Sequence, residues 1–258
     1  MSGLGLALHQ FRYDQKTFWR NPASVFFTVM FPVILLLIFD LIFGNDTVPI
    51  AGGIKTTTYY VPAIITMAVI SATMQSLAMS LIVARDDGRL KRGRGTPLPP
   101  WVFVAGRVGN SLVVSLLMLV LIAVLGWALY GVDVPWDRLP AILVTLAVGA
   151  ASFACLGIAI TAAVPTEDAA APMINAILLP LYFLSGVFIP ETEIPAGVLS
   201  VADAFPIRHF FEAFFSAYVP AGAGGSGLEL GHLAVVAAWG LAGLVLAIRF
   251  FRWTPRSG

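Results

Sequence analysis

Charged residues are scarce in this chain: Asp, Glu, Lys and Arg make up only 11% of its 258 residues, whereas 59% are hydrophobic. A soluble globular domain carries roughly 25% charged residues, so this sequence cannot cover a surface that faces water. Its apolar side chains therefore face lipid, and the composition predicts an integral membrane protein. The single cysteine, Cys155, excludes an intrachain disulfide.

Several kinds of chemical site are missing as well. The sequence has no Gly-x-x-x-x-Gly-Lys-[Ser/Thr] phosphate-binding loop, so any ATP that powers it must bind to another chain. Its apolar runs hold no row of Asp, Glu or His for relaying protons, which argues against a proton-driven transporter. His209 and Glu212 lie three residues apart, but the other histidines lie in distant segments. We expect no catalytic residue, metal site or cofactor in this chain, and no nucleic-acid partner.

The chain does have six apolar runs that are long enough to cross a membrane, for which about 20 helical residues are needed. Backbone groups cannot stay unpaired in lipid, so each run is predicted to be a helix. The expected fold is an all-α, polytopic membrane protein, with Pro32 kinking the first span and Pro172 and Pro180 interrupting the fifth. The six predicted spans cover residues 22–43, 59–84, 101–130, 139–164, 169–189 and 231–248.

The first 21 residues are predicted to form an amphipathic helix in the membrane interface, the alternative being a ragged cytoplasmic tail. One face carries Leu4, Leu8, Phe11 and Phe18, and another carries Arg12, Lys16 and Arg20. The pattern of a cleaved signal peptide is not found at this end. We expect a transmembrane domain over residues 22–250 and a cytoplasmic tail over 251–258.

The basic residues predict the orientation in the membrane. If both termini are cytoplasmic, twelve of the fifteen Lys and Arg residues lie in cytoplasmic segments, and only Lys55, Arg138 and Arg208 lie outside. This distribution fits the positive-inside rule, and an odd number of spans would break it. We therefore expect a multi-pass protein of the plasma or inner membrane with both ends in the cytoplasm.

Two segments outside the spans are candidates for function. The loop from Arg85 to Pro100 is either a positive-inside topology signal or a docking element; Asp86 and Asp87 and the stiff stretch 95–100 favour docking. The segment 191–227 is rich in aromatic residues and is predicted to form one or two short helices that lie in, or dip into, the outer leaflet, the alternative being an ordinary outer loop with an aromatic belt. Among the polar residues of the spans, we expect Gln75, Asn110, Asn175 and Ser185 to be candidates for lining a substrate pathway.

Two stretches give the chain a resemblance to a known family. One is Leu90–Trp101 with Gly106-Arg107, and the other is Leu179–Pro190 followed by Ile194-Pro195 and by Phe205–Glu212. The sequence resembles the ABC-2 type permeases, the membrane subunits of a class of ABC exporters, and within them the daunorubicin-resistance-like drug efflux subgroup. It departs from the usual pattern at Gly93, and the turn Thr166–Asp168 matches it loosely.

The resemblance implies a role for several segments. Residues 1–21 would be the elbow helix, and an ATP-binding subunit, present in two copies with its ATP and Mg²⁺, would dock beneath two paired permeases. The re-entrant helices between spans five and six would include Phe205, Pro206, Arg208 and Glu212. A second docking contact would involve Thr166, Glu167 and Asp168. The coupling helix would consist of Asp86, Asp87, Gly88, Arg89, Leu90, Lys91, Arg92 and Arg94.

The expected function is that of a permease that moves an amphiphilic, drug-like or lipid substrate outward. Export of a polysaccharide or a lipid-linked glycan is the alternative within the family. Two other classes stay open: a structural membrane protein without transport activity, and a membrane-embedded enzyme, for which His209, Glu212 and Asp203 are the candidate groups. The sequence leaves open whether the two permeases are identical.

Overall fold

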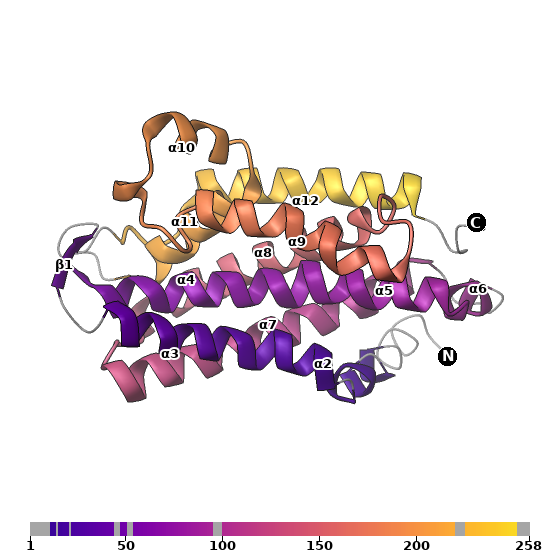
Figure 1. The fold of residues 1–258 in the computed structure, drawn as a ribbon, viewed down its shortest axis with the longest axis horizontal. Coiled ribbons are helices and arrows are strands. Elements are labelled where there is room, and N and C mark those ends of the chain that lie inside the picture. The colour runs from indigo at the N-terminus through magenta and orange to yellow at the C-terminus, as the bar shows by residue number, and fades with distance from the viewer. Residues whose placement is uncertain are drawn as a thin grey trace.

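The computed structural model describes residues 11–13, 15–20, 22–43, 47–50, 54–94, 100–219 and 225–251. The long helices run roughly along one axis and form an elongated bundle (Figure 1). One end of the bundle carries β1, α10 and α11, and we call it the hairpin end. The opposite end carries α2 and the short helix α6, and we call it the α6 end.

The first long helix is continuous but changes its winding. It consists of α2 (Pro22–Val25), the π-helical segment η1 (Phe26–Met30) and α3 (Phe31–Phe43). In η1 the Phe31 N–H bonds to the carbonyl of Phe26, five residues back. Pro32 follows directly and has no N–H to donate, so the disturbance expected at this proline coincides with a local π-helical winding. Residues 11–13 and 15–19 are also helical, whereas Leu4 and Leu8 lie outside the described residues.

The second long helix is the centre of the bundle. It consists of α4 (Thr56–Ile70), η2 (Ser71–Gln75) and α5 (Ser76–Asp86), and it contacts α3, α7, α8, α9 and α11. Although it is the least hydropathic of the four longest apolar helices, 72% of its most apolar stretch is buried, against 28% in α12. A helix surrounded by protein can carry Thr, Ser and Gln, whereas one that faces lipid needs apolar side chains.

A two-stranded antiparallel hairpin precedes this central helix, with β1 at Thr47–Ile50 and β2 at Ile54–Lys55. This hairpin was not predicted from the sequence. The strand Thr-Val-Pro-Ile contains β-branched residues, which favour an extended backbone. Pro49 is tolerated there because each strand of a two-stranded sheet has a free edge.

The remaining helices follow in chain order. They are α6 (Arg89–Arg94), α7 (Pro100–Tyr130), η3 (Trp136–Arg138), α8 (Leu139–Ile160), α9 (Glu167–Leu184), η4 (Glu191–Glu193), α10 (Ala196–Ala202), α11 (Pro206–Tyr218) and α12 (Leu230–Phe250). α12 lies along α8, and Gly240 makes this approach possible. A Cβ atom at Gly240 would lie only 2.4 Å from the Oγ of Ser152.

Among the described residues, four helices are long and apolar enough to cross a membrane: Thr56–Asp86, Ala105–Tyr130, Trp136–Ile160 and Leu230–Phe250. They coincide with four of the six predicted spans. The apolar part of the first helix, Thr28–Ile42, is shorter, and α9 begins with the charged residues Glu167 and Asp168. Both helices run beside the others in Figure 1, and their crossing of the membrane stays a prediction.

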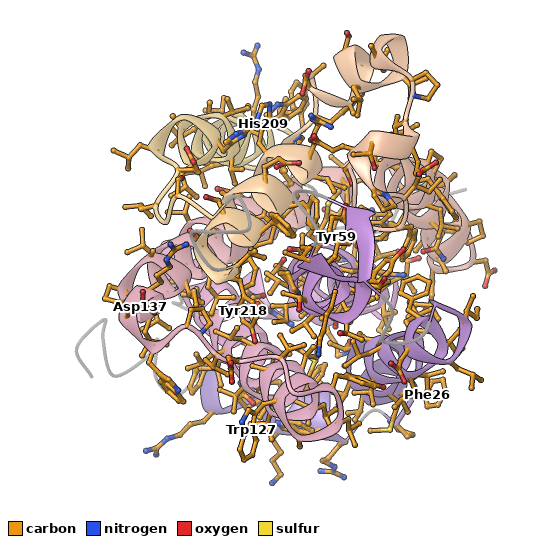
Figure 2. The ribbon with its side chains drawn as sticks, turned by 90° about the vertical axis from the view of Figure 1, so that its left-hand side faces the viewer. Phe26, Tyr59, Trp127, Asp137, His209 and Tyr218 are labelled. Carbon is orange, nitrogen blue, oxygen red and sulfur yellow. The ribbon has the colours of Figure 1, made fainter. Side chains whose placement is uncertain are left out.

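The aromatic segment between α9 and α12 forms the short helices α10 and α11, and the second of them lies inside the bundle. α11 packs against α4, α8, α9 and α12. Its residues Phe210, Phe211, Phe214 and Tyr218 are fully buried. Figure 2, which looks onto the hairpin end, shows Tyr218 and Tyr59 in the interior of the bundle and Trp127 at its rim. The aromatic density is therefore explained by packing inside the protein.

Candidate functional site

Arg85 joins the central helix to the turn between α8 and α9 at the α6 end. Its side chain is only 3% exposed. One terminal nitrogen donates to the carbonyls of Thr161 at 3.1 Å and Val164 at 3.0 Å, and the other donates to the carbonyl of Pro165 at 2.9 Å. These carbonyls follow the end of α8, where backbone carbonyls have no N–H partner within the helix. The planar guanidinium therefore fastens this turn to α5.

Asp86 completes this connection. Its Oδ1 accepts from Nε of Arg85 at 3.0 Å, and its Oδ2 accepts from the backbone N–H of Glu167 at 2.7 Å. The second contact lies at the first turn of α9, where a carboxylate also interacts favourably with the helix dipole. Asp86, predicted as a docking residue, thus has both oxygens engaged within the chain, and it brings the two predicted docking segments together.

A sharp reversal follows Asp86. Gly88 has φ of +70°, a left-handed conformation that glycine adopts at little cost, and its N–H bonds to the carbonyl of Arg85 at 3.0 Å. The chain then enters α6, where Leu90 is buried among Leu77 and Ala154 and other apolar residues. Leu90 therefore anchors α6 to the bundle.

Polar side chains cover the outside of this corner. Asp87 and Arg89 form an ion pair and are 49% and 46% exposed. Further exposed members of the predicted set are Lys91, Thr166, Glu167 and Asp168. The side chains of Arg92 and Arg94 lie outside the described residues. We call the exposed residues Asp87, Arg89, Lys91, Thr166, Glu167 and Asp168 the α6-end surface. This surface is polar and carries both positive and negative charges. The contacts of Arg85, Asp86 and Leu90 hold the segments beneath it in place.

The four candidate pathway residues do not form one group. Nε2 of Gln75 in η2 donates to Oδ1 of Asn175 in α9 at 3.0 Å, so these two join neighbouring helices. Asn110 in α7 lines a cavity of about 60 Å³ near the α6 end, together with Arg107 and Phe18. Ser185 is buried just after α9, where its hydroxyl donates to the carbonyl of Tyr182.

The turn after α9 is fixed to the central helix at the hairpin end. The hydroxyl of Tyr59 donates to the carbonyl of Gly186, and that of Tyr60 donates to the carbonyl of Phe188 at 3.3 Å. Gly186 has φ of +87°, and a Cβ atom there would lie 2.9 Å from the ring of Phe211. Both the backbone conformation and the space require glycine at this position.

A charged cluster surrounds the N-terminal half of α11. Arg208 is 12% exposed and bonds to Glu191 of η4 and to Asp203, each at 2.7 Å. Glu212 lies one turn further along α11, with Glu191, Arg208 and Asp203 as its charged neighbours. Burial, and then the neighbouring carboxyl group of Glu191, raise the pKa of Glu212 to about 8. The raised pKa favours the protonated, neutral form of Glu212.

Sequence reasoning missed one contact in this region. The Nδ1 atoms of His209 in α11 and His232 in α12 lie 2.8 Å apart, and Nε2 of His209 lies 2.9 Å from the carbonyl oxygen of Asp203. The two histidines are 23 positions apart in the chain, so no helical spacing links them. Nearby, the rings of Phe205 and Trp239 stack with centroids 6.3 Å apart, and Pro206 occupies the first turn of α11.

The comparisons with known proteins cover most of the chain. Residues 10–219 match the family model described as "ABC-2 type transporter". The chain is similar to "Inner membrane transport permease YadH" of Escherichia coli K12, with 24% identity over 80% of this chain and 83% of that protein. It is also similar to "Probable multidrug ABC transporter permease YbhR" of the same strain, with 23% identity over 59% of this chain and 41% of that protein.

The family match extends over both candidate regions, from the N-terminal helix through the end of α11. It confirms the resemblance seen in the sequence, and it implies association with an ATP-binding subunit. Together with the four long apolar helices, it shows that this chain belongs to the ABC-2 type transporter family and is a membrane permease subunit of an ABC transporter.

Proposed function

We propose that this chain is the permease of an ATP-driven exporter of the inner membrane, and that it moves an amphiphilic, drug-like or lipid substrate outward. The observation that carries the proposal is the connection made by Arg85 and Asp86. These hydrogen bonds hold the central helix, the α8–α9 turn and the start of α9 together, next to α6. A movement imposed on the α6-end surface is thus transmitted to the helix that contacts most of the bundle.

In this proposal, two ATP-binding subunits, which hold ATP and Mg²⁺, dock on the α6-end surfaces of two paired permeases. The α6 end faces the cytoplasm and the hairpin end faces outward, in keeping with the positive-inside rule. The first helix and α9 are then the two further spans, and α10 and α11 form the re-entrant cap of the pathway. The inner-membrane location follows the name of one relative, the YadH permease, and the drug-like substrate class follows the name of another, the YbhR permease.

The exposed members of the α6-end surface provide the test. Reversing the charge of Asp86 would break its hydrogen bonds to Arg85 and Glu167, so we choose the double variant Asp87→Lys with Asp168→Lys. The tagged permease is purified with its ATP-binding subunit, and the amount of bound subunit and the vanadate-sensitive ATP hydrolysis are measured. The matched control is Glu193→Lys, an exposed acidic residue of η4 at the hairpin end.

We expect the double variant to fold normally but to lose its bound subunit or its coupled transport, whereas the control retains both. Rim charges change association strongly when the partner is complementary. Full binding and full transport by the double variant would contradict the docking assignment. A wild-type permease that never binds an ATP-binding subunit would contradict the proposed function itself.

A further inference from the structure

A small polar cavity lies where the N-terminal helical segment 15–19 meets the bundle, near the α6 end. Its volume is about 60 Å³, which is several times the minimum that one water molecule needs. Its walls come from that segment, from η2 and α5, and from α7. The polar residues of the lining are Thr17, Ser76, Ser80, Arg107, Asn110 and Ser111. Hydroxyl groups, an amide and a guanidinium together favour a polar occupant over an apolar one.

The amide of Asn110 shows what kind of group the cavity takes. Its carbonyl oxygen Oδ1 is buried and receives no hydrogen bond from the residues that the structure describes. A buried acceptor without a donor costs free energy and is rare in proteins. Asn110 lies five residues into the apolar helix Ala105–Tyr130, which is about 8 Å at a rise of 1.5 Å per residue. Lipid tails offer no donor at this depth, so the group that fills the cavity has to supply one.

Arg107 brings a positive charge to the same cavity. One of its terminal nitrogens donates to Oγ of Ser80 at 3.3 Å, so the guanidinium lies beside the hydroxyl groups of the lining. A guanidinium has five N–H donors, and its planar fork matches the oxygens of a phosphate. Arg107 and Asn110 are three residues apart and share one face of α7. A phosphate and an amine joined by two carbon atoms can therefore reach both side chains at once.

The segment 15–19 places this cavity at the level of lipid headgroups. Phe18 is buried against Ala72 and Val114, which fixes the segment to η2 and α7. The next side chain, Trp19, is about half exposed. Exposed tryptophan rings are enriched where the membrane meets water. A phospholipid headgroup is therefore a group that has access to the cavity.

We propose that this cavity is a binding site for the headgroup of a phospholipid that carries both a phosphate and an N–H donor, as phosphatidylethanolamine does. The ammonium group enters the cavity and donates to Oδ1 of Asn110, while the phosphate lies against Arg107. The bound lipid joins the segment 15–19 to α5, the helix that carries Arg85. The site itself needs only the fold, but its place in the inner leaflet rests on the proposed function, in which the α6 end faces the cytoplasm.

The site is tested by native mass spectrometry of the purified, delipidated permease in mild detergent. Dioleoylphosphatidylethanolamine and dioleoylphosphatidylcholine are added in equal amounts. The two lipids share the phosphate and the tails, but choline has no N–H to donate. We expect the ethanolamine lipid to bind about tenfold more tightly, the factor for one hydrogen bond to a charged group.

Two variants separate the two contacts. Asn110→Ala removes the acceptor for the ammonium group, so the preference for ethanolamine disappears while both lipids still bind. Arg107→Gln removes the positive charge beside the phosphate, so both lipids bind more weakly while the preference remains. The matched control is Asn175→Ala, which removes the same kind of side chain from α9, outside this cavity, and keeps the preference. Thermal unfolding checks that each variant is folded before the lipids are added.

Equal binding of the two lipids by the wild type overturns the proposal and leaves a cavity that holds water alone. A preference that survives in Asn110→Ala, or one that is lost in Asn175→Ala, overturns it as well. Displacement of the bound lipid by inorganic phosphate identifies a site for a free anion and overturns the lipid assignment. A permease that binds no ATP-binding subunit but keeps the lipid preference contradicts the proposed function and leaves the headgroup site standing.

Discussion

Replacement of Arg85 by methionine removes the connection between the central helix and the α8–α9 turn while keeping much of the side-chain volume. Two buried carbonyls and one partly buried carbonyl lose this donor, and Asp86 loses its ion-pair partner. Removing one member of a buried ion pair costs about 3–5 kcal/mol. For a chain of 150–250 residues, each kcal/mol lowers the Tm by about 2–4 °C, so we expect a fall of roughly 10 °C.

The matched control is Arg89→Met. Arg89 pairs with Asp87 on the same corner, but both side chains are about half exposed. An exposed pair contributes only about 0–1 kcal/mol, so the Tm should hardly change. A third variant, Arg85→Lys, keeps the charge but lacks the planar fork that reaches three carbonyls, and its Tm should lie between those of the wild type and Arg85→Met.

The Tm is measured by thermal unfolding in mild detergent, followed by tryptophan fluorescence, and the ATP-binding subunit is then added to each folded variant. We expect Arg85→Met to lose coupled ATP hydrolysis even at temperatures where it stays folded, because the α8–α9 turn is no longer hydrogen-bonded to the helix that leads into α6. A Tm equal to that of the wild type, or an equal loss in Arg89→Met, would refute the reasoning.

Three further predictions concern packing and titration. Gly157→Ala should cost about 1–3 kcal/mol in unfolding free energy, because its Cβ atom would lie 2.8 Å from a backbone oxygen of η2, whereas Gly197→Ala, with nothing within 4 Å, should be neutral in the same melt. The bond between Gln75 and Asn175 should give a coupling of about 0.6 kcal/mol in a double-mutant cycle with alanine, and no coupling would mean that the two side chains are hydrated separately. Because Glu212 holds its proton more tightly when folded, stability should fall as pH rises from 4.5 to about 8, by at most about 1.4 kcal/mol per pH unit. Glu212→Gln should flatten this slope in pH-dependent melts, and an unchanged slope would contradict the assignment of the proton to Glu212.

Much of the architecture could be predicted from the sequence because its signals are local. Low charge and long apolar runs required a membrane protein made of helices, and four of the predicted spans agree closely with the helices of the structure. The pattern from Asp86 to Arg94 marked a projection between two spans, and Gly88 supplies the reversal that forms it. These features depend on residues that are neighbours in the chain.

The tertiary structure alone decided which side chains meet across the bundle. Lipid and the protein interior are both apolar, so hydropathy cannot show that the aromatic residues of α11 pack inward. Contacts between distant residues leave no periodic signal: Arg85 reaches carbonyls 76 to 80 positions away, and His209 meets His232 only because α11 lies against α12. The sequence determined that this chain is an integral membrane protein and where most of its helices lie. The packing of those helices decided which polar groups are buried together and which stay exposed to a partner.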